Sequence, residues 1–317
     1  MSAAARHVYG PVPSRRLGAS LGVDLVPVKT CDYDCLYCQL GRTPSRTLTR
    51  RIAPYLPAET LMEELEERLH SGIRPDYITM AGSGEPTLNS ELGKLLSMVR
   101  ELTDVPVAVL TNGSLLSDPA VSSACLGADL VLPSLDAGDE TTFREVNRPC
   151  AGVAFSEVVE GIARFRESYA GLLWLEVMLL DGINSDDRSV EKIAGLVERI
   201  RPDEVQLNTV VRPPAEPRAR PVTGARLLEA AGAIGPRATV LEEAMRQYRE
   251  ASAVRVEEGE LLELLGRRPC TRAHVADAFG INEIEALKLL SELMAHGTIV
   301  SESSGGKVFY RLLPPGE

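Results

Sequence analysis

The stretch "DYITMAGSGEPTLNSELGKLLSMVREL", residues 76–102, contains the two features that decide the fold. It begins with a short apolar run that ends in glycine, and it continues through a polar turn into apolar residues at helical spacing. A short apolar run between turn residues is typical of a buried strand, whereas a repeat near 3.6 residues is typical of an amphipathic helix. The stretch therefore predicts a strand, a turn and a helix, in that order.

The same order repeats from residue 20 to about residue 235. The other strand-like runs are residues 21–26, 106–113, 130–136, 172–179 and 204–211. Strands that alternate with helices favour βαβ units and a parallel sheet. Several runs are almost continuously apolar, as expected for strands covered on both faces. The pattern predicts an α/β fold in which six such units form either an open, barrel-like sheet or a doubly wound sheet.

The pattern changes at about residue 257. Three helical segments end at Pro269, Gly280 and Gly297, residues that commonly stop helices. Residues 298–312 form two runs of alternating apolar and polar residues on either side of a central Ser-Ser-Gly-Gly, which predicts a hairpin. Three helices and a hairpin favour a winged helix-turn-helix module. The predicted domains are residues 1–235 and 257–317, joined by a charged helical connector over residues 236–256.

The composition disfavours a large nucleic-acid partner. The net charge is −11, which repels a phosphate backbone, and aromatic residues, which stack on bases, make up only 4%. The last predicted helix carries Glu283, Glu285 and Glu292 against Lys288. We therefore expect the C-terminal module to dock a protein, a peptide or a neighbouring subunit.

The N-terminus shows no apolar run of a secretory signal. The most apolar segment, residues 172–180, is too short to cross a bilayer and contains Glu176. These features predict a soluble, cytoplasmic protein with no membrane partner. Thiols stay reduced in that compartment, so clustered cysteines there are metal ligands more often than disulfides.

The segment "KTCDYDCLYCQLG", residues 29–41, holds three of the six cysteines, as Cys31, Cys35 and Cys38. A structural zinc site needs four ligands, and of the four histidines only His7 lies near in sequence. Iron–sulfur clusters also take four cysteines as a rule. A cluster held by three thiolates would leave one iron open to bind another molecule. Of the other three cysteines, Cys125 and Cys270 are expected to be packed thiols, whereas Cys150 is either a packed thiol or a thiol hydrogen donor.

The CxxxCxxC spacing, with the aromatic Tyr37 before the last cysteine, resembles the signature of the radical S-adenosylmethionine (SAM) enzymes. The resemblance implies a partial (βα)6 TIM-like barrel with a [4Fe–4S] cluster on Cys31, Cys35 and Cys38. It also implies that SAM binds the open iron and is cleaved reductively to a 5′-deoxyadenosyl radical, which abstracts hydrogen from a substrate. A low-potential electron donor such as flavodoxin or ferredoxin is an implied partner.

Further residues are assigned to SAM by the same resemblance. The segment "AGSGEP", residues 81–86, is similar to the Gly-Gly-Glu element of the family, which holds the SAM amino group. The residues predicted to contact the cofactor are Tyr37, Gly82, Ser83, Gly84, Glu85, Asn112, Ser134, Asp136 and Asn208. Nearly all follow predicted strands at their carboxyl ends, where α/β barrels place their active sites.

Five residues are predicted to contact the substrate: Arg15, Arg16, Arg148, Glu176 and Arg212. Arg15 and Arg16 either belong to a clasp at the barrel bottom or form an anion site. Arg148 either lies on the surface or grips a carboxylate in a bidentate manner. Glu176 either points into the barrel or pairs with an arginine.

Residues 8–235 resemble, more narrowly, the tRNA-wybutosine-synthesising radical SAM enzymes. Those enzymes carry further N-terminal cysteines for a second cluster and use a catalytic lysine. Here no cysteine precedes Cys31, and only Lys29 lies near the cysteines. A single cluster and a small-molecule or peptide substrate are therefore expected. Two alternatives stay open: an iron–sulfur redox sensor that regulates transcription through the winged helix, and an activase of a partner protein.

Overall fold

The computed structural model describes residues 7–14, 16–49, 56–241, 256–281 and 283–313. Eight strands form one sheet in the order β1-β2-β3-β4-β5-β6-β7-β8. The strands are β1 (Val8–Ser14), β2 (Gly18–Asp24), β3 (Tyr77–Ala81), β4 (Val107–Thr111), β5 (Leu130–Pro133), β6 (Leu172–Leu179), β7 (Glu204–Thr209) and β8 (Ala238–Val240). β1 pairs antiparallel with β2, and every later pair is parallel. This arrangement confirms the predicted α/β class and is consistent with a partial barrel.

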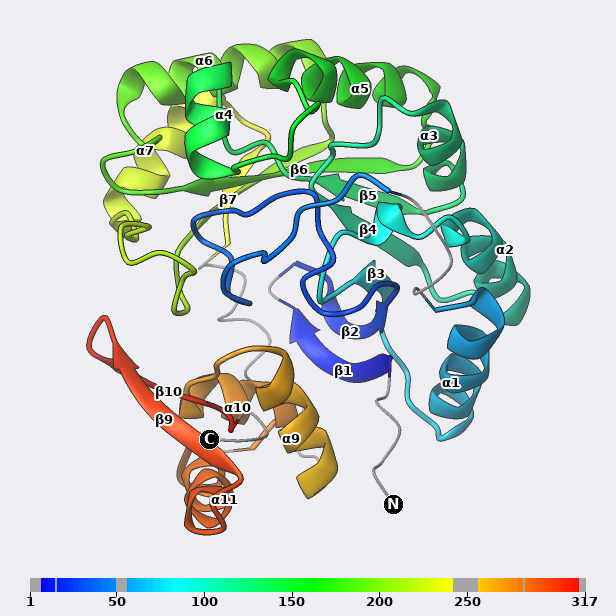
Figure 1. Cartoon of the computed structure of the whole chain (residues 1–317), viewed down its shortest axis with the longest axis vertical. Coiled ribbons are helices and arrows are strands. Elements are labelled where there is room, and N and C mark those ends of the chain that lie inside the picture. The colour runs from blue at the N-terminus through cyan, green and yellow to red at the C-terminus, as the bar shows by residue number, and fades with distance from the viewer. Residues whose placement is uncertain (1–6, 15, 50–55, 242–255, 282, 314–317) are drawn as a thin grey trace.

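Helices follow the strands and cover the outer face of the sheet, as Figure 1 shows. They are α1 (Ala58–His70), the short 3-10 helix η1 (Pro86–Leu88), α2 (Leu92–Leu102), α3 (Pro119–Cys125), α4 (Glu140–Val146), α5 (Phe155–Ser168), α6 (Asp187–Ile200) and α7 (Gly224–Ile234). Several begin at a side chain that accepts a backbone N–H, including Asp118 before α3, Asp139 before α4 and Asp186 before α6. Such caps satisfy donors that have no partner inside the helix.

Two strands lie outside the predicted set. β1 contains Pro11 and Pro13, which argue against a strand, but β1 is an edge strand, where a missing N–H removes no ladder bond. β8 lies in the range predicted as a helical connector, which was therefore wrong at residues 238–240, because this segment pairs with β7. Residues 242–255 of that connector lie outside the described residues.

The C-terminal module, defined here as residues 256–313, has a small core of its own. Its elements are α9 (Glu258–Arg267), α10 (Arg272–Phe279), α11 (Glu283–Ala295), β9 (Ile299–Ser304) and β10 (Lys307–Leu312). β9 and β10 pair antiparallel, as the predicted hairpin requires. Cys270 is fully buried and exchanges backbone hydrogen bonds with Tyr310 of β10.

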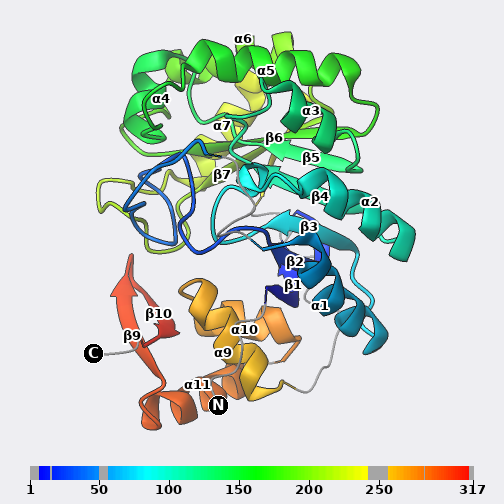
Figure 2. The same cartoon turned by 45° about the vertical axis from the view of Figure 1, so that its right-hand side comes forward.

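Figures 1 and 2 both show the module beside the N-terminal edge of the sheet, with α9 and α10 next to β1. The large core lies between the sheet and its outer helices. Among the described helices, none is both long enough and apolar enough to cross a bilayer.

Candidate active site

An open cavity of about 1280 Å³ is lined by three parts of the chain. The cysteine loop, residues 29–41, lines one part of it, the ends of the parallel strands line another, and the C-terminal module lines the third. The predicted site residues on its wall are Arg16, Cys31, Tyr37, Cys38, Gly82, Ser83, Gly84, Glu85, Asn112, Ser134, Glu176, Asn208 and Arg212. Parallel strands present their carboxyl ends at one edge, so residues far apart in sequence meet here.

Three predicted residues in the described chain, Cys35, Asp136 and Arg148, do not line this cavity. Cys35 is half-buried between the two cysteines that do. Asp136 and Arg148 have partners elsewhere, which are described below. Arg15 lies outside the described residues.

Each of the three loop thiols lies near a nitrogen donor. Lys29 Nζ donates to Cys38 Sγ at 3.1 Å, and Asn147 Nδ2 lies 3.6 Å from Cys35 Sγ. The Tyr33 N–H donates to Cys31 Sγ at 3.4 Å. Hydrogen bonds of this kind tune the reduction potential of metal-bound sulfur.

The thiols fit a cluster better than a single ion. No three Cys, His, Asp or Glu side chains within the described ranges stand close enough together to hold one metal ion. Burial, and then neighbouring charges that include the next thiolate along the loop, raise the pKa of Cys31 and of Cys35. Each later thiolate on the loop is therefore close enough to raise the pKa of the thiol before it. A cluster distributes its thiolates over several irons, and iron binding holds the thiols in their deprotonated form.

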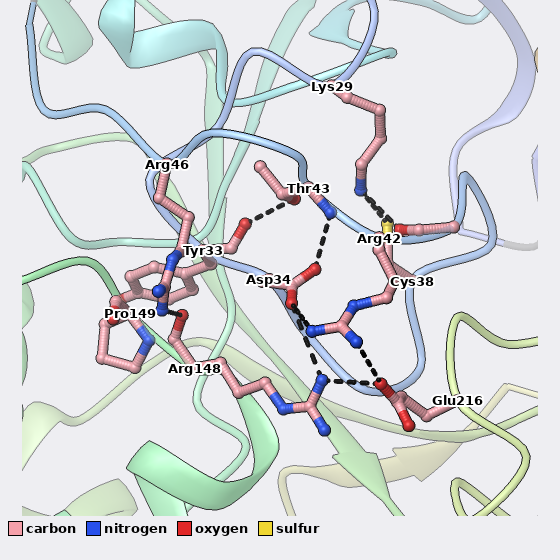
Figure 3. A network of polar contacts seen from close by, with 11 residues as sticks. Lys29, Tyr33, Asp34, Cys38, Arg42, Thr43, Arg46, Arg148, Pro149 and Glu216 are labelled. Atoms are coloured by element: carbon pink, nitrogen blue, oxygen red, sulfur yellow. Dashed lines mark hydrogen bonds and ion pairs between the residues drawn. The ribbon is translucent and has the colours of Figure 1, made fainter.

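A network of charged side chains holds the cysteine loop in place (Figure 3). Asp34, which is buried, accepts a hydrogen bond from the Thr43 N–H at 2.6 Å and pairs with Arg42 at 3.3 Å. Arg148 Nη1 donates to Glu216 Oε1 at 2.9 Å and lies 3.6 Å from Asp34 Oδ2. Arg148 thus fastens the loop and does not line the cavity, and its contact with substrate stays a prediction.

Asp136 also fastens this loop. Its Oδ2 accepts from the Tyr37 hydroxyl at 2.5 Å and from Asn147 Nδ2 at 2.6 Å, while Oδ1 accepts from the Met178 N–H at 2.9 Å. Burial raises the pKa of Asp136, although these donors oppose the shift. The carboxylate predicted to contact SAM is thus occupied by three protein donors, one of them on the cysteine loop.

Glu85 joins the turn after β3 to the end of β4. Its Oε1 accepts from the Thr87 and Thr111 hydroxyls, each at 2.6 Å, and its Oε2 accepts from the Asn112 N–H at 2.7 Å. Burial raises the pKa of Glu85 to about 7. Asn112 continues the chain of contacts, because its Nδ2 donates to Asp32 Oδ1 at 2.6 Å. Glu85 therefore fastens the turn to the end of β4 and also lines the cavity.

The glycines of this turn allow close backbone packing. A Cβ on Gly84 would lie 2.1 Å from the carbonyl oxygen of Thr30, next to the first cysteine. Gly82 has φ +116°, and a Cβ there would lie 1.5 Å from Asp24 Oδ1. Only glycine fits either position without moving the neighbouring segment. The turn from Gly82 to Glu85 is thus packed directly against the cysteine loop and the end of β2.

A second polar group, around Glu176, also lines the cavity. Glu176 accepts hydrogen bonds from Arg16 and, at 3.1 Å, from Asn208 Nδ2. Glu176 therefore pairs with an arginine and also lines the cavity. Because Arg16 is neutralised by this pair, it is a weaker anion ligand than its sequence position indicated. Arg212 donates to Gln39 Oε1 at 3.1 Å and so reaches the cysteine loop.

The sequence reasoning missed three residues of this region: Asn147, Asp24 and Arg267. Asn147 contacts both Asp136 and Cys35. Asp24 binds Ser83 of the turn and Arg267 of the C-terminal module. The signal for Asp24 was present, since it is the one charged residue in the apolar run over residues 21–26.

Comparison with known proteins gives one consistent family. Residues 25–197 match the radical SAM superfamily. A UPF0026 protein of Helicobacter pylori (strain 26695) is 33% identical over 307 residues, 96% of each chain. The protein named GTPase Obg of Brachyspira hyodysenteriae is 36% identical over 96% of this chain, but this chain spans only 45% of its length.

A solved structure shares the fold. A radical SAM methyltransferase from Sphaerobacter thermophilus matches with a TM-score of 0.52 and 22% identity, over 70% of this chain and 65% of that chain. The segment that matches the superfamily contains the cysteine loop, the Gly82–Glu85 turn and the ends of β4 and β5. With more than half of its length in that match, the chain belongs to the radical SAM superfamily.

Proposed function

We propose that Cys31, Cys35 and Cys38 hold a [4Fe–4S] cluster at which SAM is cleaved reductively, and that a substrate in the cavity then loses a hydrogen atom. Members of the superfamily use this cluster and SAM as cofactors. The observation that carries the proposal is the arrangement of three supported thiols beside a cavity whose wall also holds the glycine turn. When bound, the cluster supplies the electron that splits SAM into methionine and a 5′-deoxyadenosyl radical.

The protein residues position these groups. The turn from Gly82 to Glu85 offers backbone groups for the SAM amino group, and Asn112, Ser134 and Asn208 add amide or hydroxyl groups on the same wall. Asp136 acts through Tyr37 of the cysteine loop, whose hydroxyl it binds, so we assign it a positioning role. Lys29 donates to Cys38 and thereby helps to hold this ligand in place.

The size and charge of the cavity support a second, anionic molecule. A pocket for one small ligand has a volume of about 300–1,000 Å³, and this cavity is larger at about 1280 Å³. Its lining contains six arginine or lysine side chains and four aspartate or glutamate side chains, in a chain of net charge −11. Three of the cationic side chains, Arg16, Arg267 and Arg272, form ion pairs with acidic side chains, and the others are Arg212, Arg268 and Lys307. A small molecule or peptide with an anionic group fits this wall.

The C-terminal module is proposed to be a winged helix that docks a partner or covers the substrate. Its three helices and hairpin have the order of that motif. A module boundary near residue 257 stays part of the proposal, whereas the sheet extends beyond residue 235 to β8. A low-potential flavodoxin or ferredoxin is the proposed electron donor. The redox-sensor and activase alternatives draw no specific support from the family match.

The test is formation of 5′-deoxyadenosine by anaerobically reconstituted protein supplied with SAM and dithionite. Cys31→Ala, Cys35→Ala and Cys38→Ala should lose the product together with bound iron. Cys125→Ala is the matched control, because Cys125 is fully buried in α3, away from the loop. Absence of product from cluster-loaded wild-type protein, or its persistence in Cys35→Ala, would reject the proposal.

A further inference from the structure

One buried carboxylate connects the C-terminal module to the turn proposed to hold SAM. Asp24, at the end of β2, is 8% exposed. Its Oδ1 accepts from the Ser83 backbone N–H at 2.8 Å, and its Oδ2 accepts from the Ser83 hydroxyl at 3.2 Å. The same Oδ2 forms an ion pair with Arg267 of α9. A single side chain thus contacts the turn on one side and the module on the other.

Arg267 is held in place by an aromatic platform. Its guanidinium carbon lies 3.4 Å from the centroid of the Tyr9 ring, a cation–π arrangement. Tyr9 of β1 lies opposite Gly22 of β2, where a Cβ would come within 2.2 Å of the ring. The glycine therefore makes room for the ring, and the ring supports the guanidinium. Glu263, one helical turn earlier on α9, accepts from Arg267 Nη2 at 3.2 Å.

The position of Asp24 restrains the turn. A Cβ on Gly82 would lie 1.5 Å from Asp24 Oδ1, so the backbone of the turn packs directly on the carboxylate. Burial raises the pKa of Asp24, whereas Arg267 is the first of the groups that lower it. Without the Arg267 guanidinium, the buried Asp24 carboxylate would lose its main opposite charge. Its side chain would then move or take up a proton. Ser83 would then lose the acceptor that orients its N–H and hydroxyl.

We infer that Arg267 is a positioning residue for SAM: through Asp24 it sets the conformation of the Gly82–Glu85 turn, so the C-terminal module is part of the SAM site. This inference rests on the proposed function, because it takes the turn as the binding segment for the SAM amino group. Arg267 reaches SAM through Asp24 and Ser83 and is not a catalytic residue. The seating of the module against β1 consequently determines how tightly SAM binds.

The test compares SAM binding by cluster-loaded, full-length variants, measured as Kd by anaerobic calorimetry together with bound iron. Arg267→Met should raise Kd at least about tenfold, equivalent to about 1.4 kcal/mol, at unchanged iron content. Arg267→Lys should recover part of the affinity, since it keeps the charge but not the planar fork. The matched control is Arg311→Met, which alters the Arg311–Glu302 pair of the same module away from the cavity lining.

Kinetics provide a readout that a general loss of structure would not give. In Arg267→Met the KM for SAM in 5′-deoxyadenosine formation should rise, while kcat at saturating SAM stays within about twofold. Combining Arg267→Met with Asp24→Asn should cost less than the two separate effects together, because both remove the same link. A wild-type Kd in Arg267→Met, or an equal loss in Arg311→Met, overturns the inference.

Two outcomes separate the inference from the proposed function. Wild-type protein that carries the cluster but binds no SAM contradicts the proposed function itself. Wild-type protein that binds and cleaves SAM, with Arg267→Met indistinguishable from it, contradicts only the role of Arg267. If Arg267→Met does not fold, Arg267→Lys and Asp24→Asn decide: a raised Kd supports the link, and an unchanged Kd in both rejects it.

Discussion

The Tyr37 hydroxyl donates a hydrogen bond to Asp136 Oδ2 at 2.5 Å and thereby connects the cysteine loop to the segment that follows β5. Asp136 also accepts from Asn147, whose amide contacts Cys35. The aromatic residue of the CxxxCxxC motif and the carboxylate after the fourth parallel strand of the sheet thus form one structural unit. This unit holds the two later cysteines, and its loss should show in the retention of the cluster.

Tyr37→Phe should lower the free energy of unfolding by about 1–3 kcal/mol, since it removes one donor from a buried carboxylate. Bound iron after reconstitution should fall as well. Urea denaturation and iron analysis measure the two effects. Tyr77→Phe, at a half-buried position on β3, is the control and should change stability by less than about 0.5 kcal/mol. Equal behaviour of the two variants would show that the Tyr37–Asp136 bond does not support the loop.

Arg148→Met should destabilise the loop and leave the substrate step intact. Its guanidinium pairs with Glu216 and the buried Asp34, so its removal leaves Asp34 with less opposite charge. We expect a loss of about 1–3 kcal/mol in the free energy of unfolding and faster bleaching of the cluster in air. Arg144→Met, which removes an exposed pair with Glu140 on α4, is the control. A raised KM for the substrate with unchanged stability would restore Arg148 to the substrate site.

Gly84→Ala should abolish cluster assembly or SAM cleavage, because the added Cβ would lie 2.1 Å from the Thr30 carbonyl oxygen. The loop or the turn must then move. Gly195→Ala is a matched control on α6, where a Cβ meets nothing within 4 Å. That variant should gain about 0.5–1 kcal/mol in helix stability and keep its activity. Normal iron content and activity in Gly84→Ala would contradict the close packing described here.

The Asp139–Lys192 pair should add stability that is lost in acid. The Lys192 contact, followed by the Thr142 N–H, lowers the pKa of Asp139 to about 2. Folding therefore favours the ionised carboxylate, so the contribution is present above the unfolded pKa of about 4 and declines as the pH falls through the folded value. The two side chains are 33% and 38% exposed, so screening limits the gain to below about 1 kcal/mol.

Asp139→Asn tests this pH dependence and retains a capping side chain for α4. Its deficit in the free energy of unfolding, relative to wild type, should be present at neutral pH and should shrink as the solution is acidified. Urea denaturation at a series of pH values gives the deficit. A deficit that is constant or grows on acidification would contradict the lowered pKa.

Six of the parallel strands, β2 to β7, were predictable because each is a short apolar run followed by turn residues, as in residues 106–113, which contain β4. β1 was not predicted because its prolines argue against a strand in the sequence pattern, although an edge strand tolerates them. The structure adds β8 because three residues are too few to show a period. α3 and α4 have seven residues each, which is also too few to show a clear helical period in the sequence.

The candidate site was predictable where a residue follows a parallel strand, since topology alone brings Glu85, Asn112 and Asn208 to one edge. It was not predictable where function depends on a distant partner. Arg148 and Glu216 are 68 positions apart, and nothing near Arg148 in sequence indicates the pair. Arg267 and Asp24 are 243 positions apart and belong to different parts of the fold. The second contact follows from how the module packs on β1, and local sequence patterns encode neither contact.

The central claim, that Cys31, Cys35 and Cys38 hold a [4Fe–4S] cluster beside the SAM site, is tested most directly by electron paramagnetic resonance of the reduced, reconstituted protein with and without SAM. The account predicts the signal of a reduced [4Fe–4S] cluster whose g values change when SAM is added, and no such signal in Cys35→Ala. A cluster signal that SAM leaves unchanged, or a wild-type protein that takes up zinc and no iron–sulfur cluster, would contradict it.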